Sequence, residues 1–139
     1  MKWPLATAGD GSVYVNQGIW RATADTTRYL KFTFPSSVPA EATVTGATLT
    51  HTYKDQGGVL ACNYFEVYSG TTLLATHGSS ASAYCNSTAS FVTDTVSLPE
   101  VTTPAQANTL VVKMYVWDGS FSKRSQDDLV GLKLDYYLD

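Results

Sequence analysis

The sequence is short of charged residues. Only 15% of its 139 residues are Asp, Glu, Lys or Arg, whereas a typical soluble domain carries about 25%. The net charge is −3, and Lys123 and Arg124 form the only adjacent basic pair. Proteins that bind nucleic acid use clustered Lys and Arg to neutralise phosphates. The composition therefore argues against nucleic acid as a partner.

Long apolar runs are also missing. No segment approaches the roughly 18 consecutive apolar residues of a membrane-spanning helix, so we expect no membrane insertion. The segment from Met1 to Ser12 has no apolar stretch before a small-residue cleavage site, so no signal peptide is predicted. Two interpretations stay open: a domain excised from a longer chain, and a whole protein held within a larger assembly. We expect the second.

Patterns typical of catalysis are absent as well. No Ser lies in a Gly-x-Ser-x-Gly elbow, and neither His51 nor His77 has an evident Ser or Cys partner in the sequence. Twelve acidic residues always allow some pair of the kind that glycosidases use. Most of them, however, fall in predicted turns or on solvent faces. We therefore predict that the protein is not an enzyme and needs no cofactor.

The chain has only two cysteines, Cys62 and Cys85. Their spacing, with that of the two histidines, does not match a zinc site. Each cysteine lies near the end of a predicted strand, so we predict a disulfide between them; two buried free thiols are the alternative. A disulfide would place the mature protein in an oxidising location outside the cell.

What the chain has in abundance is alternation with a period of two. Leu30, Phe32 and Phe34 fall on one face of an extended segment, and Lys31 and Thr33 fall on the other. This pattern is typical of a half-buried β-strand. It recurs in about eight segments separated by turn signals, which predicts one all-β domain over residues 1–139, an antiparallel, jelly-roll-like β-sandwich. The expected strands are Ser12–Val15, Thr27–Phe34, Val44–Tyr53, Cys62–Tyr68, Thr72–His77, Ala89–Val96, Leu110–Trp117 and Asp128–Leu138.

The same alternation predicts which residues form the core. His51 should point inward and hydrogen-bond to a neighbour, and Gly46 should mark a bulge or the close approach of a strand. The segment Pro104–Asn108 can form one helical turn at most, with Pro at its start. The expected core residues are Phe32, Phe34, Leu49, Val112, Met114, Val116, Leu132 and Leu134.

The order of motifs along the chain is also informative. Phe32-Thr33-Phe34 is followed by a proline-bracketed bend and then by the run from Val38 to Leu49. This order resembles β-sandwich modules of bacterial surface proteins and phage virion proteins. The stretch from Phe121 to Tyr137 is similar to their closing strand, and the region from Asn16 to Asp25 is similar to their opening strand. The chain departs from their common pattern at Glu41, where Gly is frequent, and in its cysteine pair. The resemblance implies a jelly-roll-like sandwich and roles in carbohydrate binding, adhesion or structural decoration.

Two candidate sites follow from the residues. On the Leu110–Trp117 strand, Lys113, Tyr115 and Trp117 share one face that we expect to be partly exposed and to contact a protein partner or a glycan; packing beneath a loop or against another subunit is the alternative. Near the following loop, Asp118, Asp127 and Asp128 supply the oxygen ligands that Ca²⁺ prefers, so a structural calcium is a further candidate, although ordinary turns use the same residues.

These observations lead to two hypotheses for function. The first is a non-catalytic structural and interaction protein on a virion or other exterior surface: a capsid-decoration or tail-associated β-sandwich that acts through protein–protein assembly and self-association. The second is a carbohydrate-binding module of a secreted bacterial protein, with a surface polysaccharide as its partner. Aromatic side chains serve both kinds of contact, so the sequence leaves both open.

Overall fold

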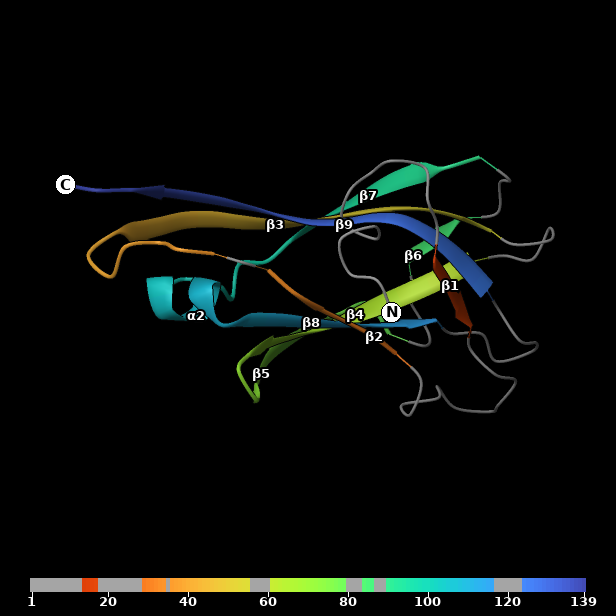
Figure 1. Cartoon of the computed structure of the whole chain (residues 1–139), viewed down its shortest axis with the longest axis horizontal. Coiled ribbons are helices and arrows are strands. Elements are labelled where there is room, and N and C mark those ends of the chain that lie inside the picture. The colour runs from red at the N-terminus through yellow and green to blue at the C-terminus, as the bar shows by residue number, and fades with distance from the viewer. Residues whose placement is uncertain are drawn as a thin grey trace.

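The computed structural model describes residues 14–17, 29–34, 36–55, 61–79, 84–86, 90–116 and 124–139. Within them the chain forms nine strands and one short helix, and every strand pair is antiparallel. The strands lie in two layers, seen edge-on in Figure 1. The predicted all-β sandwich is therefore confirmed, while the jelly-roll-like topology stays a prediction.

The first sheet is built around the longest strand pair, β3 with β9. These strands pair from Thr43 opposite Tyr137 to Asp55 opposite Ser125. The register shifts between Val44 and Gly46, which confirms the bulge, one of the two alternatives predicted at this glycine. A Cβ on Gly46 would lie 3.3 Å from Oδ2 of Asp135, so a larger residue would crowd the partner strand. The strand order is β1 (Tyr14–Gln17), β9 (Arg124–Tyr137), β3 (Thr43–Asp55) and β7 (Val92–Ser97).

The second sheet is centred on β4. This strand pairs with β8 along one side and with both β5 and β6 along the other. A tight turn joins β4 to β5, and Gly70 in it has a φ of 58°, a left-handed conformation that glycine adopts without steric cost. The strands are β2 (Leu30–Thr33), β8 (Leu110–Val116), β4 (Ala61–Ser69), β5 (Thr72–His77) and β6 (Tyr84–Asn86), the last of which was not predicted.

The helix α2 (Pro104–Asn108) lies at one end of the sandwich, between the two layers (Figure 1). Thr103 caps it and forms a capping box with Gln106, which satisfies backbone N–H groups of the first turn. Asn108 then ties the helix to the chain after β2, because its side chain bonds both the N–H and the carbonyl of Val38, at 2.8 and 2.9 Å. No helix in the described part of the chain is long and apolar enough to cross a membrane.

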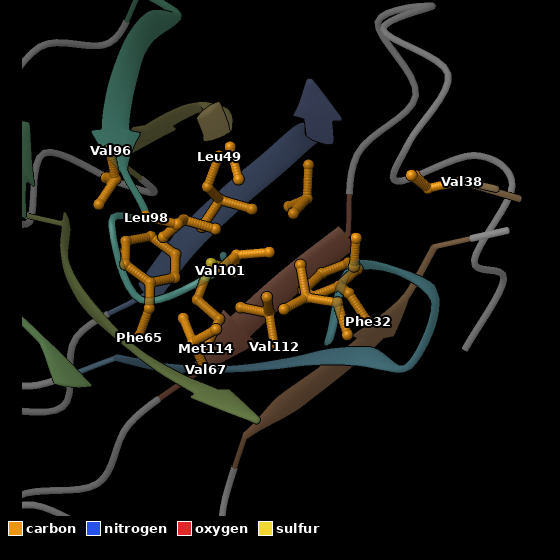
Figure 2. Packing of buried hydrophobic residues seen from close by; sticks show 14 of the residues in the cluster. Phe32, Val38, Leu49, Phe65, Val67, Val96, Leu98, Val101, Val112 and Met114 are labelled. Atoms are coloured by element: carbon orange, nitrogen blue, oxygen red, sulfur yellow. The ribbon is translucent and has the colours of Figure 1, made fainter. Parts of the chain in front are cut away.

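The core fills the space between the sheets on the α2 side (Figure 2). Four predicted core residues are fully buried: Phe32, Leu49, Val112 and Met114. Three others, Phe34, Leu132 and Leu134, are only half-buried and pack against the cluster. Leu132 and Leu134 lie on β9, along the stretch where this strand has a neighbour on one side only within the described residues. The side chain of Val116 lies outside the described residues.

Candidate functional site

Four tyrosines gather on the outer face of the second sheet. Because Phe65 and Val67 of β4 are fully buried in the core, alternation turns the residues between and beside them outward. The matching outward positions on β8 and just before β2 add further side chains. We call this set the tyrosine face: Tyr29, Tyr64, Glu66, Tyr68, Lys113 and Tyr115.

Three rings of the tyrosine face, on β4, on β8 and just before β2, lie side by side. Tyr64 and Tyr115 are cross-strand partners, and their rings stack with centroids 5.0 Å apart and an interplanar angle of 11°. Tyr29 lies against Tyr115 from the other side, with centroids 5.5 Å apart. Aromatic pairs at such distances add about 0.5–1.5 kcal/mol beyond area burial. The contacts therefore hold the rings in a fixed arrangement.

The two charged side chains of this face lie among the rings. Glu66 Oε1 accepts hydrogen bonds from the hydroxyls of Tyr115 at 2.6 Å and Tyr68 at 3.0 Å. The ammonium group of Lys113 lies 4.8 Å from the ring centroids of both Tyr29 and Tyr68, which are cation–π distances. Burial, together with the bond to Glu66, raises the pKa of Tyr115, and the same two causes raise the pKa of Tyr68. Both hydroxyls therefore stay protonated donors at neutral pH.

The structure changes the aromatic site predicted from sequence. The prediction that Tyr115 is exposed is wrong, because only 4% of it is accessible with Tyr29 and Tyr64 packed against its ring. Lys113 is half-buried, and Trp117 lies outside the described residues. The most accessible ring of the tyrosine face is instead that of Tyr29, which is 39% exposed. Tyr29 lies in a different strand region from β8, so alternation along β8 gave no sign of it.

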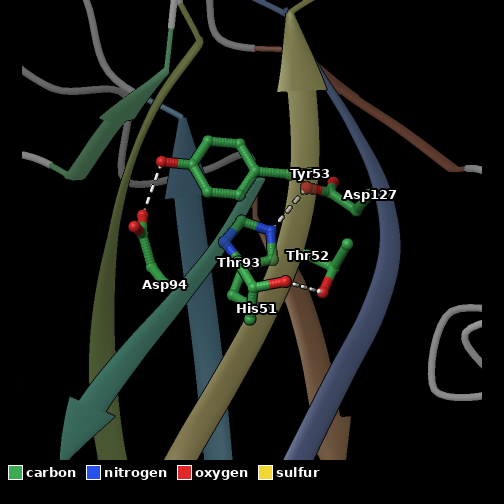
Figure 3. Close-up of polar contacts among 6 residues, drawn as sticks. All are labelled: His51, Thr52, Tyr53, Thr93, Asp94 and Asp127. Carbon is green, nitrogen blue, oxygen red and sulfur yellow. Dashed lines mark hydrogen bonds and ion pairs between the residues drawn. The ribbon is translucent and has the colours of Figure 1, made fainter. Parts of the chain in front are cut away.

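A polar group occupies the other end of the sandwich interior. Along β3 the inward positions change from Leu49 to His51 and Tyr53, all fully buried. His51 Nε2 lies 2.7 Å from Oδ1 of Asp127 on β9, and its ring stacks on Tyr53 at 4.2 Å (Figure 3). The Tyr53 hydroxyl donates to Asp94 on β7 at 2.6 Å. The prediction of an inward His51 bonded to a neighbour is confirmed.

This polar group links the strands of the first sheet through side chains as well as through the backbone. His51 joins β3 to β9, and Tyr53 joins β3 to β7. Burial and the hydrogen bond to Asp94 raise the pKa of Tyr53. The side chains of His51 and Asp127 are both 0% exposed. Their contact therefore holds β3 and β9 together inside the sandwich.

The predicted calcium ligands take different positions. Asp127 is fully buried and paired with His51, and Asp128 is also buried. Asp118 lies outside the described residues. No group of three or more His, Cys, Asp or Glu side chains within the described ranges is placed to hold a metal ion. The calcium site therefore stays a prediction that depends on Asp118.

The disulfide between Cys62 and Cys85 is confirmed. The cysteines are direct cross-strand partners of β4 and β6, with their Cα atoms 4.1 Å apart. The bridge fastens the three-residue strand β6 to the sheet that carries the tyrosine face. The second histidine also has a partner, since His77 Nε2 lies 2.7 Å from Oε1 of Glu100. Sequence spacing gave no sign of that pair, which joins the end of β5 to the turn before α2.

Comparison with known proteins gives no family for this chain. The sequence matches no model of a known protein family, and no curated protein matches it.

Proposed function

We propose that this chain is a non-catalytic structural and interaction protein on an exterior surface, a virion component that decorates a capsid or a tail through protein–protein assembly. The observation that carries the proposal is the tyrosine face. Tyrosine supplies large contact area at low conformational cost and is enriched where proteins meet. Here the exposed ring of Tyr29 supplies contact area, and it packs against the buried ring of Tyr115, which stacking on Tyr64 and a bond to Glu66 hold in place.

The disulfide supports the exterior location. Disulfides persist in secreted proteins and on virion or cell surfaces, and they are rare in reducing compartments. In this chain the Cys62–Cys85 bridge lies on β4, the strand that also provides Tyr64, Glu66 and Tyr68. Oxidation outside the cell would therefore link β6 covalently to the sheet that carries the proposed contact surface.

Rebinding to particles tests the proposal. Particles would be purified from a source whose gene for this chain has been deleted, and the purified chain would be added back and sedimented with them. Tyr29→Ala should weaken binding about 30-fold, which corresponds to the roughly 2 kcal/mol of an interface hot spot. Phe91→Ala is the matched control, because Phe91 is 37% exposed and has a lysine, Lys54, 4.6 Å from its ring, but directly precedes β7 of the other sheet. Equal binding by Tyr29→Ala and the unaltered chain would contradict the proposal.

A surface polysaccharide is the second candidate partner, and the surroundings of Tyr29 favour it. The partly exposed ring of Tyr29 can stack on the apolar face of a sugar, and Lys113 and Glu66 lie nearby to bond hydroxyl groups. A glycan array separates the two candidates. Binding to one class of polysaccharide that Tyr29→Ala abolishes and Phe91→Ala leaves unchanged would support carbohydrate binding instead of assembly.

A further inference from the structure

Over most of its length, the outer edge of β9 has no neighbouring strand among the described residues. Within the described residues, β1 pairs with β9 only from Arg124 to Asp127. From Leu129 to Tyr137, the only strand that pairs with β9 in the described part of the chain is β3. An edge of this length leaves a row of backbone donors and acceptors ready to pair with another strand, and natural proteins usually cover or disrupt such edges.

Apolar side chains are concentrated on the same stretch. Tyr136, Tyr137 and Leu138 are 45%, 49% and 53% exposed. The inward-facing Leu132 and Leu134 are only half-buried, and they line a hollow of about 340 Å³ beside Ser36, Ser37 and Val38. The end of β9 therefore exposes apolar surface along an edge that no described strand covers, and pairing with another strand would bury both.

We propose that a second copy of this chain pairs with this edge, β9 against β9, antiparallel about a twofold axis at Leu134. The partner strand must pair beyond Asp127, because β1 occupies the same edge of β9 from Arg124 to Asp127.

The charges select the register. With the axis at Leu134, Lys133 of one copy lies opposite Asp135 of the other, and the symmetry makes this contact twice. Within one chain these two side chains already lie 3.5 Å apart, 73% and 50% exposed. Opposite charges directly across a strand pair stabilise it, and like charges destabilise it. The same register places Leu132 opposite Tyr136, so apolar residues also meet on the inner side.

Sedimentation equilibrium with charge-reversal variants tests the proposal. The unaltered chain should show a monomer–dimer equilibrium. Lys133→Asp alone, or Asp135→Lys alone, should raise the dimer dissociation constant on the order of tenfold, because like charges then oppose each other twice. The double variant Lys133→Asp with Asp135→Lys restores the opposite charges and should recover the affinity. A chain that stays monomeric at all concentrations, or a dimer that single charge reversal leaves unchanged, would overturn the proposal.

Cysteine substitution tests the register directly. Directly opposed residues have Cβ atoms about 4.5–5.5 Å apart, and Cys62–Cys85 shows that opposed residues of this fold accept a bridge. Leu134→Cys should therefore give a disulfide-linked dimer under mild oxidation. Leu132→Cys is the matched control, also half-buried and inward-facing, but its two copies would lie four residues, or about 13 Å, apart along the strands. Equal cross-linking of both variants would overturn the register. Because the tyrosine face lies on the other sheet, these outcomes do not depend on the function proposed above.

Discussion

Replacing Phe32 with alanine should remove a large part of the stability of this sandwich. Phe32 is fully buried and lies opposite Val112, which is also in the core cluster. Deleting a buried Phe side chain to Ala typically costs about 3–5 kcal/mol, from lost transfer free energy and the cavity left behind. A domain of this kind has only about 5–15 kcal/mol of stability in total. We therefore expect Phe32→Ala to fold only marginally.

Thermal unfolding measures this effect. Unfolding entropy is roughly 2.1 cal/mol/K per residue, about 0.3 kcal/mol/K for a chain of 139 residues. A loss of about 3–5 kcal/mol then lowers Tm by roughly 10–17 °C. Thr33→Ala is the matched control, because Thr33 is the next residue of β2 but is exposed on the opposite face. An unchanged Tm for Phe32→Ala, or equal losses for both variants, would refute the assignment of the inner face of β2.

Two further predictions concern the disulfide and the buried tyrosines. Replacing Cys62 and Cys85 together with Ser should lower the free energy of unfolding by about 3 kcal/mol, as loop closure predicts, in a urea titration; mass spectrometry of unreduced protein that found two free thiols would contradict the bridge. Burial and bonds to carboxylates raise the pKa values of Tyr53 and Tyr115 above the ordinary 10.0. The folded chain therefore keeps protons that the unfolded chain releases above about pH 10, so stability is full below that pH and falls as pH rises above it. Tyr53→Phe should flatten the decline measured by urea unfolding between about pH 9 and 11, and an unchanged slope would show that Tyr53 does not cause the decline.

The architecture was predictable because period-two alternation records which face of a strand is buried. It identified the inner faces of β2, β3 and β8 through Phe32, Leu49 and Val112. Local chemistry was equally informative at Gly46, where the bulge occurs, and at Pro104, where the helix begins. These features depend on short-range sterics and on burial, and the types and spacing of residues along the sequence indicate both.

Other features depend on contacts between distant segments, which alternation does not record. Alternation placed Tyr115 on the outer face correctly, but only the packing of Tyr29 and Tyr64 against it shows that this outer residue is buried. Similarly, the inward pattern of β9 gave no sign that Leu132 and Leu134 lie beside an edge with no neighbour among the described strands, because strand order decides which residues lie at an edge. The partner of His51, Asp127, is 76 residues away in the chain.

The two proposed surfaces combine in one geometry. Two strands that pair antiparallel in one sheet are related by a twofold axis perpendicular to that sheet, so both copies keep their inner faces on the same side. In the β9 dimer, both second sheets then lie on that side, and both tyrosine faces point in the same direction. Such a dimer would present two contact surfaces to one extended partner, and linked contacts of this kind raise avidity by about 10²–10⁴. Lys133→Asp should therefore weaken binding to a particle or polysaccharide by a large factor, while leaving unchanged the affinity for a soluble ligand that occupies a single tyrosine face. Equal effects on both ligands would show that the β9 edge itself contacts the partner and that the twofold arrangement is wrong.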